Sequence, residues 1–232
     1  MSNARVINIH PLSELQEFDI FSSISIKTLQ KYLPYFYYRT YKKNQCLFME
    51  GDPRDKIFFL LEGYVAFERG SEEGKMLYLD IVKSKQMFPY GGIFEEKTYH
   101  ETATALTDIK VFFIQTTVME ELLKKNPKQL LNIIAKLTKI LNLHKDRVEK
   151  ILIPNAQERV LHTLQFLMDD LGEKKGEEVV IPCPLTAFCI SKISGTTRET
   201  VSLIMNQLKR EGIISIKSKV ITIHETEYLR NI

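Results

Sequence analysis

The chain has 232 residues, of which 44% are hydrophobic and 26% charged, and its 32 Lys+Arg and 29 Asp+Glu leave a net charge of +3. This composition, with only 10 Gly and 8 Pro, excludes disordered, collagen-like and low-complexity proteins, and the length suits one large domain or two small ones. No apolar run approaches the roughly 20 residues that span a bilayer, and the first residues lack the apolar core of a signal peptide. We therefore expect a cytoplasmic protein.

The first half of the chain predicts a helical cap followed by a β-roll or barrel. Residues 1–35 place apolar side chains at loosely helical intervals. From residue 35 to about 114 the pattern changes to short aromatic and branched runs separated by Gly- and Pro-containing turns. The run 57–61 is apolar on both faces and suits a buried strand, whereas 74–81 alternates like a half-buried one.

A long helix is expected to begin at Pro127, where a missing N–H costs nothing. Seven positions along it are spaced alternately by four and three residues, namely Leu130, Ile134, Leu137, Leu141, His144, Val148 and Ile151. Because so narrow a seam buries best against a copy of itself, the repeat predicts a parallel homodimer. The alternative is an ordinary helix packed on its own β domain. His144 is interpreted as a neutral histidine that packs by its ring.

A domain boundary is predicted at Pro154. Asn155 and Glu158 form a capping-box pattern that starts the next helix, which buries one apolar face. The helix is expected to end at Gly172 in a left-handed conformation, with a charged loop over 173–178.

Residues 185–212 predict a helix-turn-helix. Gly195 supplies the turn, and Thr196 is expected to cap the second helix in a capping box with Glu199. Residues 213–223 alternate around a basic turn and predict a β-hairpin wing. Hydroxyl, guanidinium, carboxylate and ammonium groups in this segment can bond base edges and phosphates, so the candidate DNA-binding residues are Thr186, Thr196, Thr197, Arg198, Glu199, Ser202, Lys217 and Lys219.

Charge supports a DNA-binding interpretation, because residues 185–223 carry six bases against two acids. The alternative is a small helical bundle with a solvated basic surface. Enzymatic motifs such as GxGxxG, GxxxxGK[ST], HExxH and GxSxG are absent, and the histidines and cysteines lack metal-ligand spacing. Three cysteines are an odd number that argues against a disulfide framework. We therefore predict no enzyme, no catalytic residues, no metal and no cofactor.

Two motifs resemble the Crp/Fnr superfamily of bacterial transcription regulators. Gly51, Asp52 and Pro53, followed by the run 57–61 and Glu62-Gly63, are similar to its early β-roll signature, and residues 197–202 are similar to its recognition helix. The resemblance extends from about residue 18 to the end. It implies a cyclic-nucleotide-binding-like β-roll and a dimer on a near-palindromic operator, with RNA polymerase as a candidate further partner. The stretch 101–108 also resembles the branch that regulates the arginine deiminase pathway in low-GC Gram-positive bacteria.

The departures from that family concern its effector pocket. Tyr90, beside Gly91, stands where cyclic-nucleotide-binding members carry a glutamate for the ribose, and Tyr99 and His100 stand where they carry an arginine and a serine for the phosphate. Loss of the bidentate arginine predicts weak or no cyclic AMP binding. These four residues are the effector-pocket candidates, and the pocket either holds another small molecule or is filled by its own side chains.

The sequence lacks ligand patterns for an iron–sulfur cluster or haem, the other cofactors of the family. Residues 1–45 contain no cysteine for an iron–sulfur cluster. His10 or His100 offers at most a lone haem ligand, and isolated histidines usually are not ligands. In the recognition segment, Leu203 replaces the arginine common in the family, which predicts an altered half-site.

The predicted fold class is α+β. A helical cap and β-roll (jelly roll) sensor domain covers residues 1–116, a dimerisation helix region 117–153, and a winged helix-turn-helix domain 154–232. The predicted function is a sequence-specific, homodimeric DNA-binding transcription regulator modulated by an unidentified small-molecule effector. The alternatives are a ligand-sensing roll that acts through protein partners with vestigial DNA binding, and an enzyme that uses the roll as an allosteric domain, for which no segment is left to house catalysis.

Overall fold

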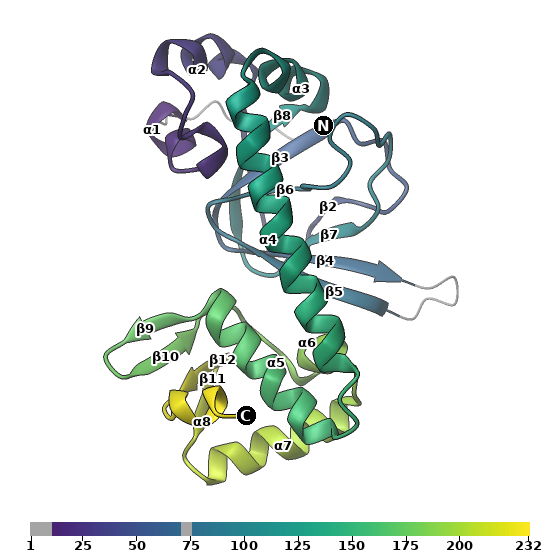
Figure 1. Ribbon diagram of the computed structural model, residues 1–232, viewed down its shortest axis with the longest axis vertical. Coiled ribbons are helices and arrows are strands. Elements are labelled where there is room, and N and C mark those ends of the chain that lie inside the picture. Colours follow the sequence, from purple (N-terminus) through teal and green to yellow (C-terminus); the bar gives the residue numbers. More distant parts are fainter. Residues whose placement is uncertain (1–10, 71–75) are drawn as a thin grey trace. The chain divides into compact units, whose positions relative to one another are not determined.

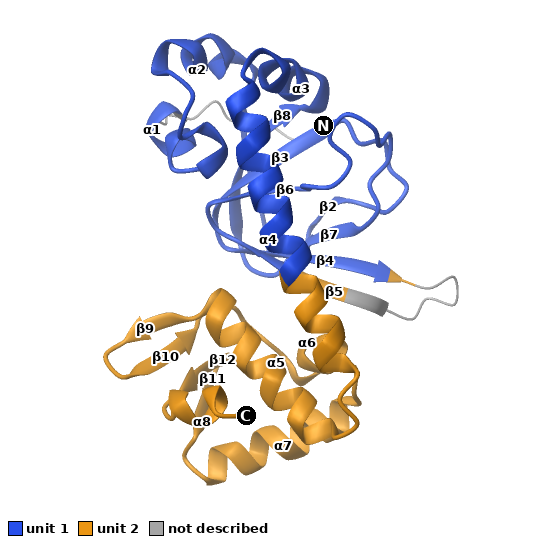
Figure 2. Cartoon of the chain, in the orientation of Figure 1, with its two compact units in different colours: residues 1–69, 81–142 blue, residues 70–80, 143–232 orange. Residues whose placement is uncertain are grey.

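The computed structural model describes residues 11–70 and 76–232. The chain forms two compact units, residues 1–69 with 81–142, and residues 70–80 with 143–232 (Figure 2). The division falls within α4 (Pro127–Ile151), the long helix expected from Pro127 onward.

The described part of residues 11–125 combines short helices with strands β1 to β8, of which most of β5 groups with the second unit (Figures 1 and 2). The described part of the cap expected over 1–35 consists of short helices joined by turns, and residues 1–10 lie outside the described residues. The elements are α1 (Pro11–Gln16), η1 (Asp19–Phe21), α2 (Ile26–Tyr32), η2 (Leu33–Tyr35), β1 (Tyr37–Tyr41), β2 (Cys46–Phe48), β3 (Lys56–Glu62), β4 (Tyr64–Gly70), β5 (Met76–Lys83), β6 (Gln86–Phe88), β7 (Thr102–Ala105), β8 (Ile109–Gln115) and α3 (Thr116–Lys125).

Two four-stranded sheets form the roll, in the orders β1-β8-β3-β6 and β2-β7-β4-β5. The pairs β1·β8, β3·β8, β3·β6 and β4·β7 are antiparallel. The strand expected over 74–81 is present as β5, which begins at Met76, and residues 74 and 75 lie outside the described part. The roll expected from the short runs and turns is therefore present.

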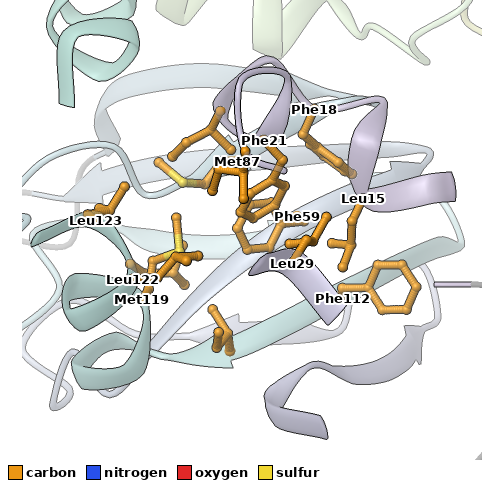
Figure 3. Close-up of a cluster of buried hydrophobic side chains, with 14 of the residues drawn as sticks. Leu15, Phe18, Phe21, Leu29, Phe59, Met87, Phe112, Met119, Leu122 and Leu123 are labelled. Atoms are coloured by element: carbon orange, nitrogen blue, oxygen red, sulfur yellow. The ribbon is translucent and has the colours of Figure 1, made fainter. Parts of the chain in front are cut away.

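Strand β3 is buried on both faces, as its apolar run predicts, with residues 57–61 all buried. Phe59 lies in a helical-side cluster, where Phe18 meets it edge-on at 5.2 Å and Phe21 is tilted against it at 5.0 Å (Figure 3). Side chains from α1, α2, α3 and α4 complete that cluster. Phe58 and Leu60 point the other way into an aromatic cluster inside the roll.

The second unit carries a further sheet in the order β11-β12-β10-β9. Its elements are α5 (Ala156–Leu171), β9 (Glu173–Lys175), β10 (Glu178–Ile181), α6 (Ala187–Ser194), α7 (Arg198–Arg210), β11 (Ile214–Lys217), β12 (Val220–Ile223) and α8 (Thr226–Arg230). Asn155 caps α5 as expected, because its side chain accepts from the N–H groups of Gln157 and Glu158.

Two expectations around Gly172 are wrong. The segment 173–178 is not a loop, because β9 pairs antiparallel with β10. Gly172 is extended, at φ −74° and ψ 142°, instead of left-handed. The glycine is required there by close approach, since a Cβ would lie 2.2 Å from the Met168 carbonyl oxygen and 2.5 Å from Val179 Cγ1.

We predict that Gly63→Ala destabilises the protein much more than Gly51→Ala. Both glycines have positive φ, 91° and 86°, so both substitutions cost roughly 1 kcal/mol in backbone strain. Only at Gly63 does the new Cβ also meet main chain, 2.6 Å from the Asp108 carbonyl oxygen, whereas nothing lies within 4 Å at Gly51. Urea unfolding measures both, and equal losses of stability would contradict the steric argument.

Candidate DNA interface and effector pocket

The first helix of the helix-turn-helix, α6, is held at both ends by local hydrogen bonds. Thr186 is its N-cap, and the Thr186 hydroxyl oxygen accepts from the Cys189 N–H at 3.2 Å. Gly195 is its left-handed C-cap at φ 59°, as the predicted turn requires. The Thr186 hydroxyl is thus engaged in capping, so its role as a DNA contact stays a prediction.

The second helix, α7, begins one residue later than expected. Thr197 is the N-cap, and its hydroxyl oxygen accepts from the Thr200 N–H at 3.1 Å. The expected capping box of Thr196 with Glu199 is therefore wrong, because Glu199 lies in the first turn but not three residues after the cap. Because Thr196 and Thr197 are adjacent and both can cap a helix, the sequence pattern alone does not show which of them is the N-cap.

Arg198 and Glu199 project from the first turn of α7 with exposed side chains, and neither side chain makes a hydrogen bond or ion pair within the described residues. The Ser202 hydroxyl donates to the Arg198 carbonyl at 2.9 Å, and Leu203 is 67% exposed. The opposite face is buried as predicted, through Val201, Ile204, Met205 and Leu208. Helix α7 therefore exposes polar side chains and one leucine on the face opposite its buried face.

The chain leaves α7 through a turn that fixes the start of the wing. Gly212 has φ 73°, its N–H donates to the Lys209 carbonyl, and the Ile213 N–H donates to the Leu208 carbonyl. These two bonds form a Schellman motif. Strands β11 and β12 follow in antiparallel register, which confirms the predicted hairpin.

The tip of the wing has an uncommon backbone. Ser218 and Lys219 both have positive φ, 51° and 69°, as a two-residue hairpin turn requires. Lys217, Ser218 and Lys219 are all exposed. The wing thus exposes two lysines, Lys217 at the end of β11 and Lys219 on the constrained turn.

The four effector-pocket candidates are not brought together. Tyr99 is buried inside the roll, stacked on Phe48 at 3.7 Å, and its hydroxyl donates to the Lys56 carbonyl at 2.9 Å. Burial raises the pKa of Tyr99 to about 12. Tyr90 instead packs against the helical-side cluster, where burial raises its pKa as well.

The other two candidates lie at the surface. His100 is half exposed, with its Nε2 atom 3.1 Å from Glu96 Oε1. A Cβ on Gly91 would meet nothing within 4 Å. Among the described residues, no group of three or more His, Cys, Asp or Glu side chains is placed to hold a metal ion. None of the described helices is long and apolar enough to cross a membrane.

The apolar positions of the predicted seam are mostly exposed along α4. The exposed fractions are 59% for Ile134, 55% for Leu141 and 59% for Val148. Leu137 and Ile151 are exposed as well, while Leu130 packs partly against the helical-side cluster. His144 is half-buried, with its Nε2 atom 3.9 Å from Asp80 Oδ2.

Sequence reasoning missed three residues. Leu131 and Leu152 are exposed at 66% and 76%, and they lie beside the seam without belonging to its repeat. Arg54, next to the Gly-Asp-Pro turn, is only 4% exposed. Nothing in the sequence distinguishes this arginine from one on the surface.

Comparison with known proteins agrees with this geometry. The model of the family described as "Cyclic nucleotide-binding domain" matches residues 38–126, and that of the "Crp-like helix-turn-helix domain" matches residues 158–232. The HTH-type transcriptional regulator ArcR of Staphylococcus epidermidis is 28% identical over 197 residues, which are 85% of this chain and 86% of that protein. The global nitrogen regulator of Nostoc sp. is 25% identical over 190 residues, covering 80% and 84%.

Solved structures share the fold. FixK2 from Bradyrhizobium japonicum has a TM-score of 0.73 at 19% identity, with 84% of this chain and 96% of that chain covered. A CRP/FNR family transcriptional regulator from Thermus thermophilus has a TM-score of 0.60 at 25% identity, with 84% and 96% covered.

A β-roll, a long helix and a C-terminal winged helix-turn-helix define a DNA-binding transcription regulator. The chain belongs to the Crp/Fnr superfamily of such regulators. This confirms the predicted family and fold, and it supports the DNA-binding interpretation over the partner-acting alternative. ArcR and a global nitrogen regulator match at similar identity, so the arginine deiminase branch stays a prediction.

We predict that Thr197→Ala destabilises the second unit by about 1 kcal/mol, the usual loss for an N-cap hydroxyl. Thr196→Ala is the matched control, because Thr196 is not the N-cap of α7. It is expected to change the free energy of unfolding by no more than about 0.5 kcal/mol. Chemical denaturation of both variants checks this, and the reverse order would restore Thr196 as the cap.

Proposed function

We propose that this regulator acts as a parallel homodimer whose two winged helix-turn-helix domains bind a near-palindromic operator. The observation that carries the dimer is the row of exposed apolar side chains along α4, at the spacing of a coiled-coil seam. Exposed leucine, isoleucine and valine at alternating steps of three and four residues are best covered by the same face of a second copy.

The recognition helix α7 would enter the major groove with its first turn toward the bases. Arg198 can bond a guanine bidentately, and Glu199 can accept from a cytosine amino group. Thr186, Thr196, Thr197 and Ser202 would contact phosphates or base edges from the same end, and Lys217 and Lys219 would reach the backbone from the wing. Leu203 offers a thymine methyl an apolar contact in place of the family's arginine.

The effector is proposed to be a small molecule other than cyclic AMP. The roll has no arginine at the two positions where the family holds the cyclic phosphate, and Phe48, Phe58, Phe88 and Tyr99 are buried within it. The residues present therefore do not fit a cyclic nucleotide. An effector would act by favouring one of two dimer states for which its affinities differ. No catalysis is proposed, and the cytoplasmic location and RNA polymerase as partner remain predictions.

Selection from a pool of random duplexes with the purified ligand-free protein, across a salt series, tests this function. Recovery of a palindrome with a steep salt slope is expected for a dimer that makes phosphate contacts. If selection recovers no motif even after addition of cell extract, which would supply an effector, the proposal is wrong.

We predict that Arg198→Ala weakens specific DNA binding by roughly 1–3 kcal/mol and relaxes the choice of base at one position of each half-site. Arg210→Ala removes the same charge from the other end of α7. Since that control lies outside the proposed base readers, it is expected to weaken all sequences alike. Fluorescence anisotropy on the selected operator and on single-base variants measures both. An unchanged base preference in Arg198→Ala would remove this residue from the readers.

We predict that Leu141→Lys converts the dimer to monomers at micromolar concentration. Each protomer loses about 1.5–3 kcal/mol of apolar burial, so the dimer dissociation constant rises at least about 100-fold. Asn142→Lys introduces the same group at the neighbouring exposed position and is expected to leave the dimer intact. Sedimentation equilibrium distinguishes the 27.0 kDa monomer from a species of twice that mass. If Leu141→Lys remains a dimer, as Asn142→Lys is expected to, the dimer interface lies elsewhere.

A further inference from the structure

Arg54 is a buried cation whose side chain makes no hydrogen bond within the described residues. It is 4% exposed, and its Nε, Nη1 and Nη2 atoms have no partner among the described residues. Its main chain is held firmly, since its N–H donates to the Lys97 carbonyl at 2.8 Å and its carbonyl accepts from the Thr116 hydroxyl at 3.0 Å. Burial lowers the pKa of the guanidinium, and Glu120 and Glu96 oppose that shift. A buried guanidinium without hydrogen-bond partners destabilises the free protein.

Arg54 lines a cavity of about 680 Å³ that belongs entirely to the first unit. One wall is aromatic, formed by Tyr37 and Phe113, whose rings stack at 5.3 Å. The cavity is large enough for a small metabolite. It adjoins the roll interior through Phe113, which also packs against the cluster that holds Tyr99, but Tyr99 is not among its lining residues.

The start of α3 opens onto the same cavity through Thr116 and Thr117. Gln115, the N-cap, makes no side-chain capping bond, and the first turn carries no acidic residue. The Thr116 N–H donates to the Asp55 carbonyl, but the N–H groups of Thr117 and Val118 lie in the first turn, where no helical acceptor exists. An uncapped helix start beside an unpaired arginine attracts an oxyanion.

The remaining charges restrict which oxyanion fits. Three cations line the cavity, Arg54, Lys56 and Lys97, together with four carboxylates, Asp55, Glu95, Glu96 and Glu120. Lys56 and Asp55 pair with each other at 2.7 Å. A phosphate dianion would be repelled by the acids that remain, whereas a molecule with one carboxylate and one cationic group matches both signs.

Access to the guanidinium involves the loop that carries Phe94. Phe94 has φ 76°, a strained conformation for a bulky residue, and its N–H donates to Glu120 Oε1 at 2.9 Å. Phe94 and its three successors form part of the cavity wall. Because this loop lines the same cavity as Arg54, a ligand that reaches the guanidinium is expected to contact it.

We propose that this cavity is a binding site for a small zwitterion of the amino-acid class. Arg54 and the first N–H groups of α3 hold its carboxylate, and the carboxylates of Glu95, Glu96 and Glu120 face its cationic group. The site deepens the proposed function by giving the effector a chemical class and a position. Its test measures ligand binding alone, so its outcome is independent of operator binding.

The test measures thermal unfolding of the full chain with each of the twenty protein amino acids, with acetate and with inorganic phosphate, followed by calorimetric titration. At least one amino acid is expected to raise the melting temperature of the wild type, because it binds only the folded state. Arg54→Met, which keeps the buried stem, is expected to lower its affinity at least about tenfold. Arg69→Met, an exposed arginine of the same unit, is expected to bind as the wild type does.

Two further readouts separate binding from a structural role. Arg54→Met without ligand is expected to melt at a higher temperature than the wild type, since it removes an unpaired buried charge. If this variant does not fold, the amide resonances of Thr117 and Val118 in the wild type are expected to shift on addition of the stabilising amino acid. Stabilisation by phosphate alone, by no probe, or equally in wild type and Arg54→Met would overturn the proposal, as would unshifted Thr117 and Val118 amides.

Discussion

The burial of β3 on both faces is the constraint on which the first unit depends. A strand with Ile57, Phe59 and Leu61 on one side and Phe58 and Leu60 on the other cannot leave either side in water. One face must be covered by helices and the other by the interior of the roll. The short cap helices, α3 and the first turns of α4 supply the first cover, and the aromatic cluster supplies the second.

This arrangement gives α4 two different sides. Ile133 is buried in the helical-side cluster, and Gln129, 1% exposed, accepts from the Ser23 hydroxyl at 2.9 Å. These contacts fix the rotation of the helix about its own axis. Ile134 and Leu141 are left pointing to solvent, so the same packing that completes the roll also creates the proposed dimer seam. The two interpretations of this helix, local cover and dimer seam, are therefore complementary.

The two candidate sites handle polar groups in opposite ways. In the helix-turn-helix, Thr186, Thr197 and Gly212 satisfy the helix ends from within the chain, which leaves Arg198 and Glu199 free to meet a partner. The start of α3 is not satisfied in this way, because the Gln115 side chain does not cap it, and the Arg54 side chain beside it has no hydrogen-bond partner among the described residues. The exposed face of the helix-turn-helix is preorganised, which suits a partner that supplies its own charges. In the cavity, polar groups without partners destabilise the free protein, and a ligand that pairs with them recovers that free energy.

The sequence alone determined the features that follow from periodicity and turn chemistry. The buried strand, the long helix from Pro127, the Asn155 cap, the helix-turn-helix and the wing all have local patterns, because each depends on residues close together in the chain. Tertiary structure decided what depends on neighbours distant in sequence. Tyr90 and Tyr99 separate because they pack in clusters on different sides of a sheet, and Arg54 is buried beside residues of α3 and the 94–97 loop. No local pattern encodes such contacts, since their energy arises only when segments far apart in the chain pack together.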